Sequence, residues 1–143
     1  TDQLLPTERD LWLSMSDADR HHAVLVAQKV AATLGQQGTR PVLSAALLHD
    51  VGKTVSGLSL YGRVIATLII AFVGRARAAT WTRGFKRRVA LYARHPDLGA
   101  EMLTRAGSDP LTIAWARETW RERDVARCRR PESPRFWRGA RRD

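Results

Sequence analysis

Apolar residues recur along this chain at spacings of three and four, which is the period of an amphipathic helix. In the clearest example they fall on one face at Ala23, Ala27, Val30 and Leu34. Ser16 precedes this segment and can accept hydrogen bonds from a first helical turn, while Gly35 follows it as a natural stop. Alternation of apolar and polar residues, typical of half-buried strands, does not persist anywhere. The pattern predicts an all-α protein.

The same signals predict six further helices. Proline or a capping residue opens several of them, glycine ends others, and the dense apolar run from Val42 to Leu48 is suited to a central position. We expect one continuous, largely apolar helix over residues 61–79. The other five are expected near residues 7–13, 41–49, 85–94, 96–106 and 110–115.

Length and composition favour one folded domain. The chain has 143 residues, is 44% hydrophobic and holds one cysteine, Cys128, so no internal disulfide can form. Residues 121–143 carry two prolines, many arginines and no apolar face. We therefore predict a single compact helical bundle over residues 7–120 and a basic tail over 121–143, whose order the sequence does not decide.

The formal charge of +10 is concentrated in two blocks. Residues 75–94 carry seven basic side chains and no acid, and residues 117–143 carry ten arginines against five acids. Such blocks are either solvated surface or attract phosphates, nucleic acid or acidic lipid head groups. The strongly apolar stretch from Val64 to Val73 is shorter than the roughly 20 residues of a membrane span, and no signal peptide opens the chain. We expect a cytoplasmic domain without a membrane partner.

Histidine and aspartate provide the candidate chemistry. The four histidines are His21, His22, His49 and His95, and Asp50 directly follows His49. Imidazole and carboxylate together suit a divalent transition metal, which could activate water and polarise a phosphoryl oxygen. Taken singly, each histidine can equally be structural.

Three segments resemble the HD superfamily of metal-dependent phosphohydrolases. The segment ALLHDVGK at residues 46–53 is similar to the central signature of that family. HAVLVA at residues 22–27 resembles its first histidine segment, and HPDLGA at 95–100 resembles a downstream segment of the HDIG and HD-GYP-like branches. The resemblance spans roughly residues 11–115 and implies an HD-type helical bundle.

The resemblance also implies roles for individual residues. His22, His49 and Asp50 would be metal ligands, and His95 would bind a second metal or line the same cleft. Asp50 and Lys53 would take part in catalysis, with Lys53 and Arg63 binding substrate phosphate. The cofactor would be a divalent ion, with Mn, Mg, Fe, Co and Zn not distinguished, and the substrate a small phosphoester such as a nucleotide. His21 competes with His22 as first ligand, but spacing to the segment that follows favours His22.

The end of the chain departs from the family pattern. Thr119 and Trp120 stand where relatives have a His-His pair, and Asp124 is the one candidate for a final aspartate ligand. The alternative function is therefore a catalytically reduced HD domain that binds a ligand or regulates a partner. A third hypothesis makes residues 75–94 a nucleic-acid interface.

Overall fold

Every regular element in the described part of the chain is helical. A computed structural model describes residues 2–118, and no strand occurs among them. In chain order the elements are α1 (Pro6–Ser14), α2 (Asp17–Leu34), η1 (Gly35–Gln37), α3 (Arg40–Leu48), η2 (Val51–Ser56), α4 (Leu60–Val73), α5 (Arg75–Ala78), α6 (Gly84–Ala93) and α7 (His95–Arg105). Residues 110–118 are also helical. The all-α prediction is confirmed for residues 2–118. The predicted domain end at 120 and the tail at 121–143 lie outside the described residues.

Most helix ends follow from local chemistry. The Ser16 hydroxyl accepts the Asp19 backbone N–H at 3.2 Å, and α2 stops at Gly35, whose φ is 51°. At the last helical stretch, the Asp109 carboxylate accepts the Leu111 N–H at 2.9 Å. Capping oxygens satisfy backbone donors that a helix leaves unpaired, so these residues predict helix starts reliably.

The predicted single helix over residues 61–79 is wrong. The chain forms α4 and α5 instead, separated by Gly74 at φ 87°, ψ 143°. That conformation is outside the helical region and is open to glycine at little cost. Apolar periodicity continues across the break, so periodicity alone did not reveal it.

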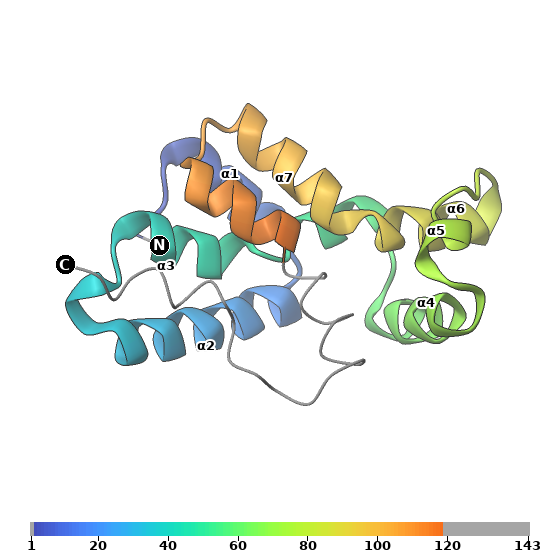
Figure 1. The fold of residues 1–143 in the computed structure, drawn as a ribbon, viewed down its shortest axis with the longest axis horizontal. Coiled ribbons are helices and arrows are strands. Elements are labelled where there is room, and N and C mark those ends of the chain that lie inside the picture. Colours follow the sequence, from blue (N-terminus) through green and yellow to red (C-terminus); the bar gives the residue numbers. More distant parts are fainter. Residues whose placement is uncertain (1, 119–143) are drawn as a thin grey trace.

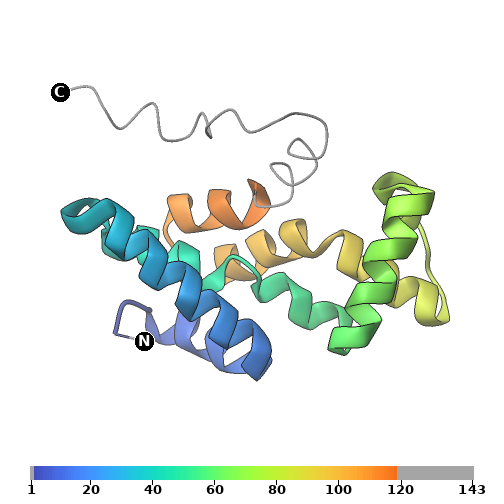
Figure 2. The same cartoon turned by 90° about the horizontal axis from the view of Figure 1, so that it is seen from below.

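Two clusters of apolar side chains form the interior. The first joins α1, α3, α7 and the last helical stretch through Trp12, Leu48, Leu103 and Ala116. The second joins α4, α5 and α6 through Ala66, Ile70, Ala78, Val89 and Tyr92. Figure 1 shows α4, α5 and α6 gathered at one end of the molecule, while α1, α2 and α3 lie toward the other. Figure 2 shows α4 running across this end, beyond the end of η2.

Length and apolarity decide whether a helix can cross a bilayer. Among residues 2–118 no single helix is long and apolar enough to cross a bilayer. The bent pair of segments Arg40–Ser56 and Leu60–Val73, which meet at 87°, passes the same test together by length and composition.

Candidate metal centre

The centre forms where α3 ends and the chain turns into η2. His49 caps the C-terminus of α3, and Asp50 follows at φ −106°, ψ 6°, in the sparsely allowed bridge region where active-site residues often sit. Gly52 then packs directly on the start of α7. A Cβ added to Gly52 would overlap the His95 carbonyl and lie 2.6 Å from the Gly99 nitrogen. The absence of a side chain at Gly52 therefore allows η2 and α7 to meet backbone to backbone.

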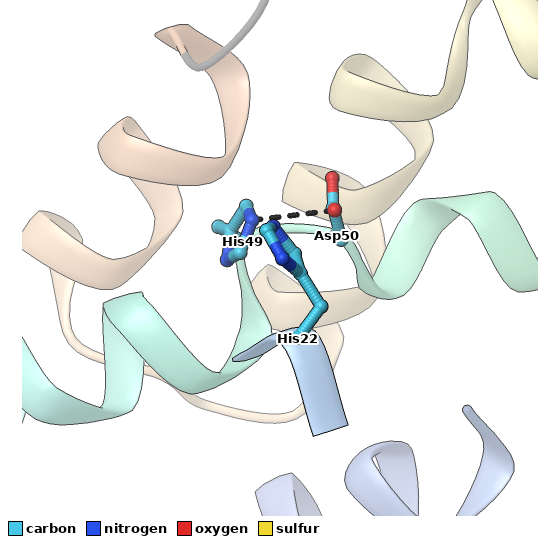
Figure 3. A group of neighbouring side chains, drawn as sticks. All are labelled: His22, His49 and Asp50. Atoms are coloured by element: carbon cyan, nitrogen blue, oxygen red, sulfur yellow. Dashed lines mark ion pairs between the residues drawn. The ribbon is translucent and has the colours of Figure 1, made fainter. Parts of the chain in front are cut away.

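Three of the predicted ligands come together. Ligand atoms of His22, His49 and Asp50 all lie within 4.8 Å of one another, as Figure 3 shows. His49 and Asp50 are buried, whereas His22 reaches the group from the exposed side of α2. The ring centroids of His22 and His49 are 5.7 Å apart in an edge-on arrangement. Two imidazoles and one carboxylate thus converge from two different helices.

The hydrogen bonds of His49 fix which ring nitrogen faces Asp50. Its Nδ1 lies 2.8 Å from the Ala46 carbonyl oxygen, which can only accept, so Nδ1 carries a proton and donates. Nε2 lies 3.2 Å from Asp50 Oδ2. In the neutral ring Nε2 is also an acceptor, so two lone pairs face each other across that distance. Only a cation between them, either a proton or a metal ion, makes this arrangement favourable.

The electrostatics keep Asp50 ionised. Burial alone would raise the pKa of the Asp50 carboxyl, but the hydrogen bond and charge of His49, together with the charge of Lys53, outweigh burial. They hold the pKa of Asp50 well below its usual range. Lys53 Nζ lies 2.5 Å from the same Oδ2 that faces His49. The carboxylate is therefore available as an anionic ligand, and Lys53 partly neutralises it.

His95 lies beside the centre but outside the group of three. It is buried at the N-terminus of α7, and its Nδ1 donates to the Tyr92 carbonyl at 2.6 Å, as His49 Nδ1 does to Ala46. Burial lowers the pKa of His95 to about 4, although the Tyr92 hydrogen bond and the charge of Asp50 act in the opposite direction. His95 is accordingly a neutral imidazole near pH 7, which is the form that binds metals.

Arg63 has a protein partner. Its guanidinium donates to both carboxylate oxygens of Asp19 at 2.6 and 2.7 Å, and its Nε donates to the Leu58 carbonyl. The two charged side chains are largely buried, at 13% and 11% exposed. This pair ties α4 to α2, while the substrate contact predicted for Arg63 stays a prediction. Asp124, the candidate final ligand, lies outside the described residues.

Several residues that shape the centre escaped the sequence analysis. Asp19 is an acid in the first turn of α2, and nothing local marks it as the partner of a residue 44 positions away. The Ala46 and Tyr92 carbonyls orient the two buried histidines. Here a signal existed: a histidine at a helix C-terminus has the carbonyl three residues earlier within reach, because that carbonyl has no partner inside the helix.

We compared the chain with known proteins. No family model, curated protein or solved structure matches it. The donor set itself, two imidazole nitrogens and a carboxylate oxygen, fits a divalent transition metal and does not distinguish Zn, Fe, Co or Mn. The chemistry of these residues therefore carries the functional conclusion.

Proposed function

We propose that this chain is an HD-type, metal-dependent phosphohydrolase in which His22, His49 and Asp50 hold a divalent cation. One observation carries the proposal. His49 Nε2 and Asp50 Oδ2, both able to bind a metal ion, lie 3.2 Å apart, with His22 beside them. Metal–ligand distances of about 2.0–2.2 Å place neighbouring ligand atoms roughly 3 Å apart, so this spacing supports a shared ion.

The charge of each residue indicates its role in metal or substrate binding. A divalent cation, when bound, supplies the positive charge that activates water and polarises a phosphoryl oxygen. Asp50 and the two histidines bind it, and the Ala46 carbonyl keeps His49 Nε2 directed at it. Lys53, already against Asp50 Oδ2, has an ammonium group that can bind a substrate phosphate and balance its developing charge. Neutral His95 is buried close enough to interact electrostatically with Asp50.

The substrate class follows from charge as well as from the motifs. Between Asp50 and Asp97 the sequence holds nine Lys and Arg residues and no acid. A basic stretch of this kind attracts anions such as phosphates. Together with the resemblance of segments 22–27, 46–53 and 95–100 to HD proteins, this supports a small phosphoester, most simply a nucleotide.

Metal titration followed by turnover tests the proposal. The purified chain, freed of metal, would be titrated with Mn²⁺, Zn²⁺, Co²⁺, Fe²⁺ and Mg²⁺ by calorimetry, then assayed on p-nitrophenyl phosphate, bis-p-nitrophenyl phosphate and nucleoside mono-, di- and triphosphates. We expect one ion per chain and phosphate release that requires it. His21→Ala serves as the matched control, because His21 neighbours His22 but is outside the group of three. A chain that binds none of these ions contradicts the proposal.

A second function is favoured by the contact between Lys53 and Asp50. The Lys53 ammonium contacts Asp50 Oδ2, the oxygen that faces His49, and therefore competes with a metal ion for the carboxylate. Together with Thr119 and Trp120 at the place of the family's His-His pair, this favours a regulatory module that binds a phosphorylated ligand without cleaving it. Nucleotide binding with no phosphate release in any of the five metals would support this second function.

A further inference from the structure

The outer face of α4 is apolar and uncovered in the described structure. Of the eleven large hydrophobic side chains exposed among residues 2–118, six lie on this one helix. They are Leu60, Tyr61, Val64, Ile65, Leu68 and Phe72. Phe72 is 90% exposed and Tyr61 is 82% exposed. The spacings of one, three and four place them on a single stripe, opposite Ala66 and Ile70, which pack against α5 and α6.

The residues around this stripe are predominantly basic. Arg63 is the single charged residue of α4, and it is turned inward onto Asp19. Residues 51–96 contain no aspartate or glutamate, and Asp97 of α7 lies 3.9 Å from Arg75 of α5. The basic residues exposed on α5, α6 and the segment between them are Arg77, Arg83, Lys86, Arg87 and Arg88. Figure 1 shows these three helices together at one end of the molecule.

We propose that the outer face of α4 docks on the surface of an anionic lipid bilayer, with the basic residues of α5 and α6 drawn to its acidic head groups. An exposed apolar helix face combined with a polybasic region is the two-part requirement for reversible surface binding. At 14 residues, α4 is about 21 Å long, shorter than the roughly 30 Å of hydrocarbon, so it would lie in the interface. This proposal departs from the expectation of no membrane partner made in the sequence analysis.

A second copy of the chain fits the face less well. Pairing two such ends would bring two predominantly basic regions together, which like-charge repulsion opposes. An anionic bilayer is opposite in sign and attracts the same region.

Vesicle sedimentation of the full chain tests the inference, and it needs neither metal nor turnover, so it stands apart from the proposed function. The vesicles would contain phosphatidylcholine alone or with 30% phosphatidylglycerol. We expect partitioning at least tenfold stronger with the anionic lipid, weakened several-fold when NaCl rises from 0.1 to 0.5 M. In the double variant Leu68→Glu/Phe72→Glu, we expect partitioning to the anionic vesicles to be more than tenfold weaker than for the parent chain.

Leu13→Glu is the matched control, because Leu13 is similarly exposed, at 57%, but lies on α1. It should change partitioning less than twofold, and circular dichroism should show all variants folded. Equal partitioning to both vesicles, or none to either, overturns the inference. A dimer would also overturn it. If vesicle binding is absent, and analytical ultracentrifugation shows a concentration-dependent dimer that Leu68→Glu/Phe72→Glu abolishes, the face binds a second copy of the chain.

Discussion

Gly52 and His95 are in backbone contact, and this contact places His95 beside the candidate metal centre. A side chain at Gly52 would overlap the His95 carbonyl oxygen, and Gly99 on the next turn of α7 presents no side chain in return. Close approach of η2 to α7 places His95 beside Asp50, close enough for the Asp50 charge to act on its pKa. A glycine inside the His-Asp-x-Gly-Lys segment is therefore explained by packing, since Gly52 is not among the glycines with positive φ.

Gly52→Ala should destabilise the fold. We expect the free energy of unfolding to fall by about 3 kcal/mol, at the upper end of the range for overpacking, because the added methyl meets backbone that cannot rotate away. Urea denaturation followed by circular dichroism measures this. Gly107→Ala is the control: Gly107 follows α7 at φ 72° with nothing within 4 Å, so the change should cost only the backbone strain of about 1–2 kcal/mol. Equal losses in the two variants would contradict the packing argument.

His49→Ala and Asp50→Asn should each lose the divalent metal. Removing a group that merely orients a ligand costs about 10–100-fold in affinity, so removing a ligand should cost on the order of 100-fold or more. Calorimetric titration of the metal-free variants measures the loss, with His21→Ala retaining the affinity of the parent. Unchanged affinity in both ligand variants would remove the metal centre from this site.

Lys53→Met should retain metal and lose turnover. The Lys53 ammonium contacts Asp50, where it competes with the metal ion for the carboxylate, so the variant should keep its metal affinity. The same change removes the positive charge that would face the substrate phosphate. We expect turnover to fall on the order of 10², the scale for one well-placed electrostatic contact. Steady-state assays with saturating metal measure it. Turnover equal to that of the parent would mean that Lys53 serves only Asp50.

Stability should depend on pH through His95. Its pKa of about 4 in the folded chain lies below the ordinary value of 6.5, so the unfolded chain binds more protons between these limits. The contribution of His95 to the free energy of unfolding, up to about 3 kcal/mol, is fully present above pH 6.5 and is lost as the pH falls toward 4. Urea denaturation of the metal-free chain from pH 7 to 4 measures the slope, and His95→Gln should flatten it. If the dependence of stability on pH is unchanged in His95→Gln, other titrating groups cause that dependence.

Breaking the pair between Arg63 and Asp19 should destabilise the chain. Both side chains are largely buried, so Arg63→Met or Asp19→Asn leaves one charge without its partner, at an expected cost of about 3 kcal/mol. Urea denaturation of both single variants and of the double variant gives the coupling energy. We expect the double variant to lose clearly less than the sum of the two. Additive losses, with a raised KM in Arg63→Met, would instead indicate a substrate contact.

Local sequence was sufficient for much of the secondary structure. Capping by Ser16 and the positive φ of Gly35 act over a few residues, so the ends of α2 could be predicted from its own sequence. The adjacency of His49 and Asp50 is likewise local, and the spacing argument for His22 over His21 agrees with the group that the fold brings together. The break at Gly74 was missed because apolar residues continue on both sides of it.

Only the tertiary structure decided which residues meet. The sequence identified Arg63 by its charge, but its partner Asp19 lies 44 residues earlier and is reached only once α4 packs near α2. The burial of His95 depends on the backbone contact with Gly52, and the exposure of the α4 stripe depends on which of its faces meets α6. Capping and periodicity are properties of a few consecutive residues, whereas burial, pKa and partner depend on how separate helices pack. That is why the sequence by itself predicted most of the helices and named the candidate ligands, and the packing determined their surroundings.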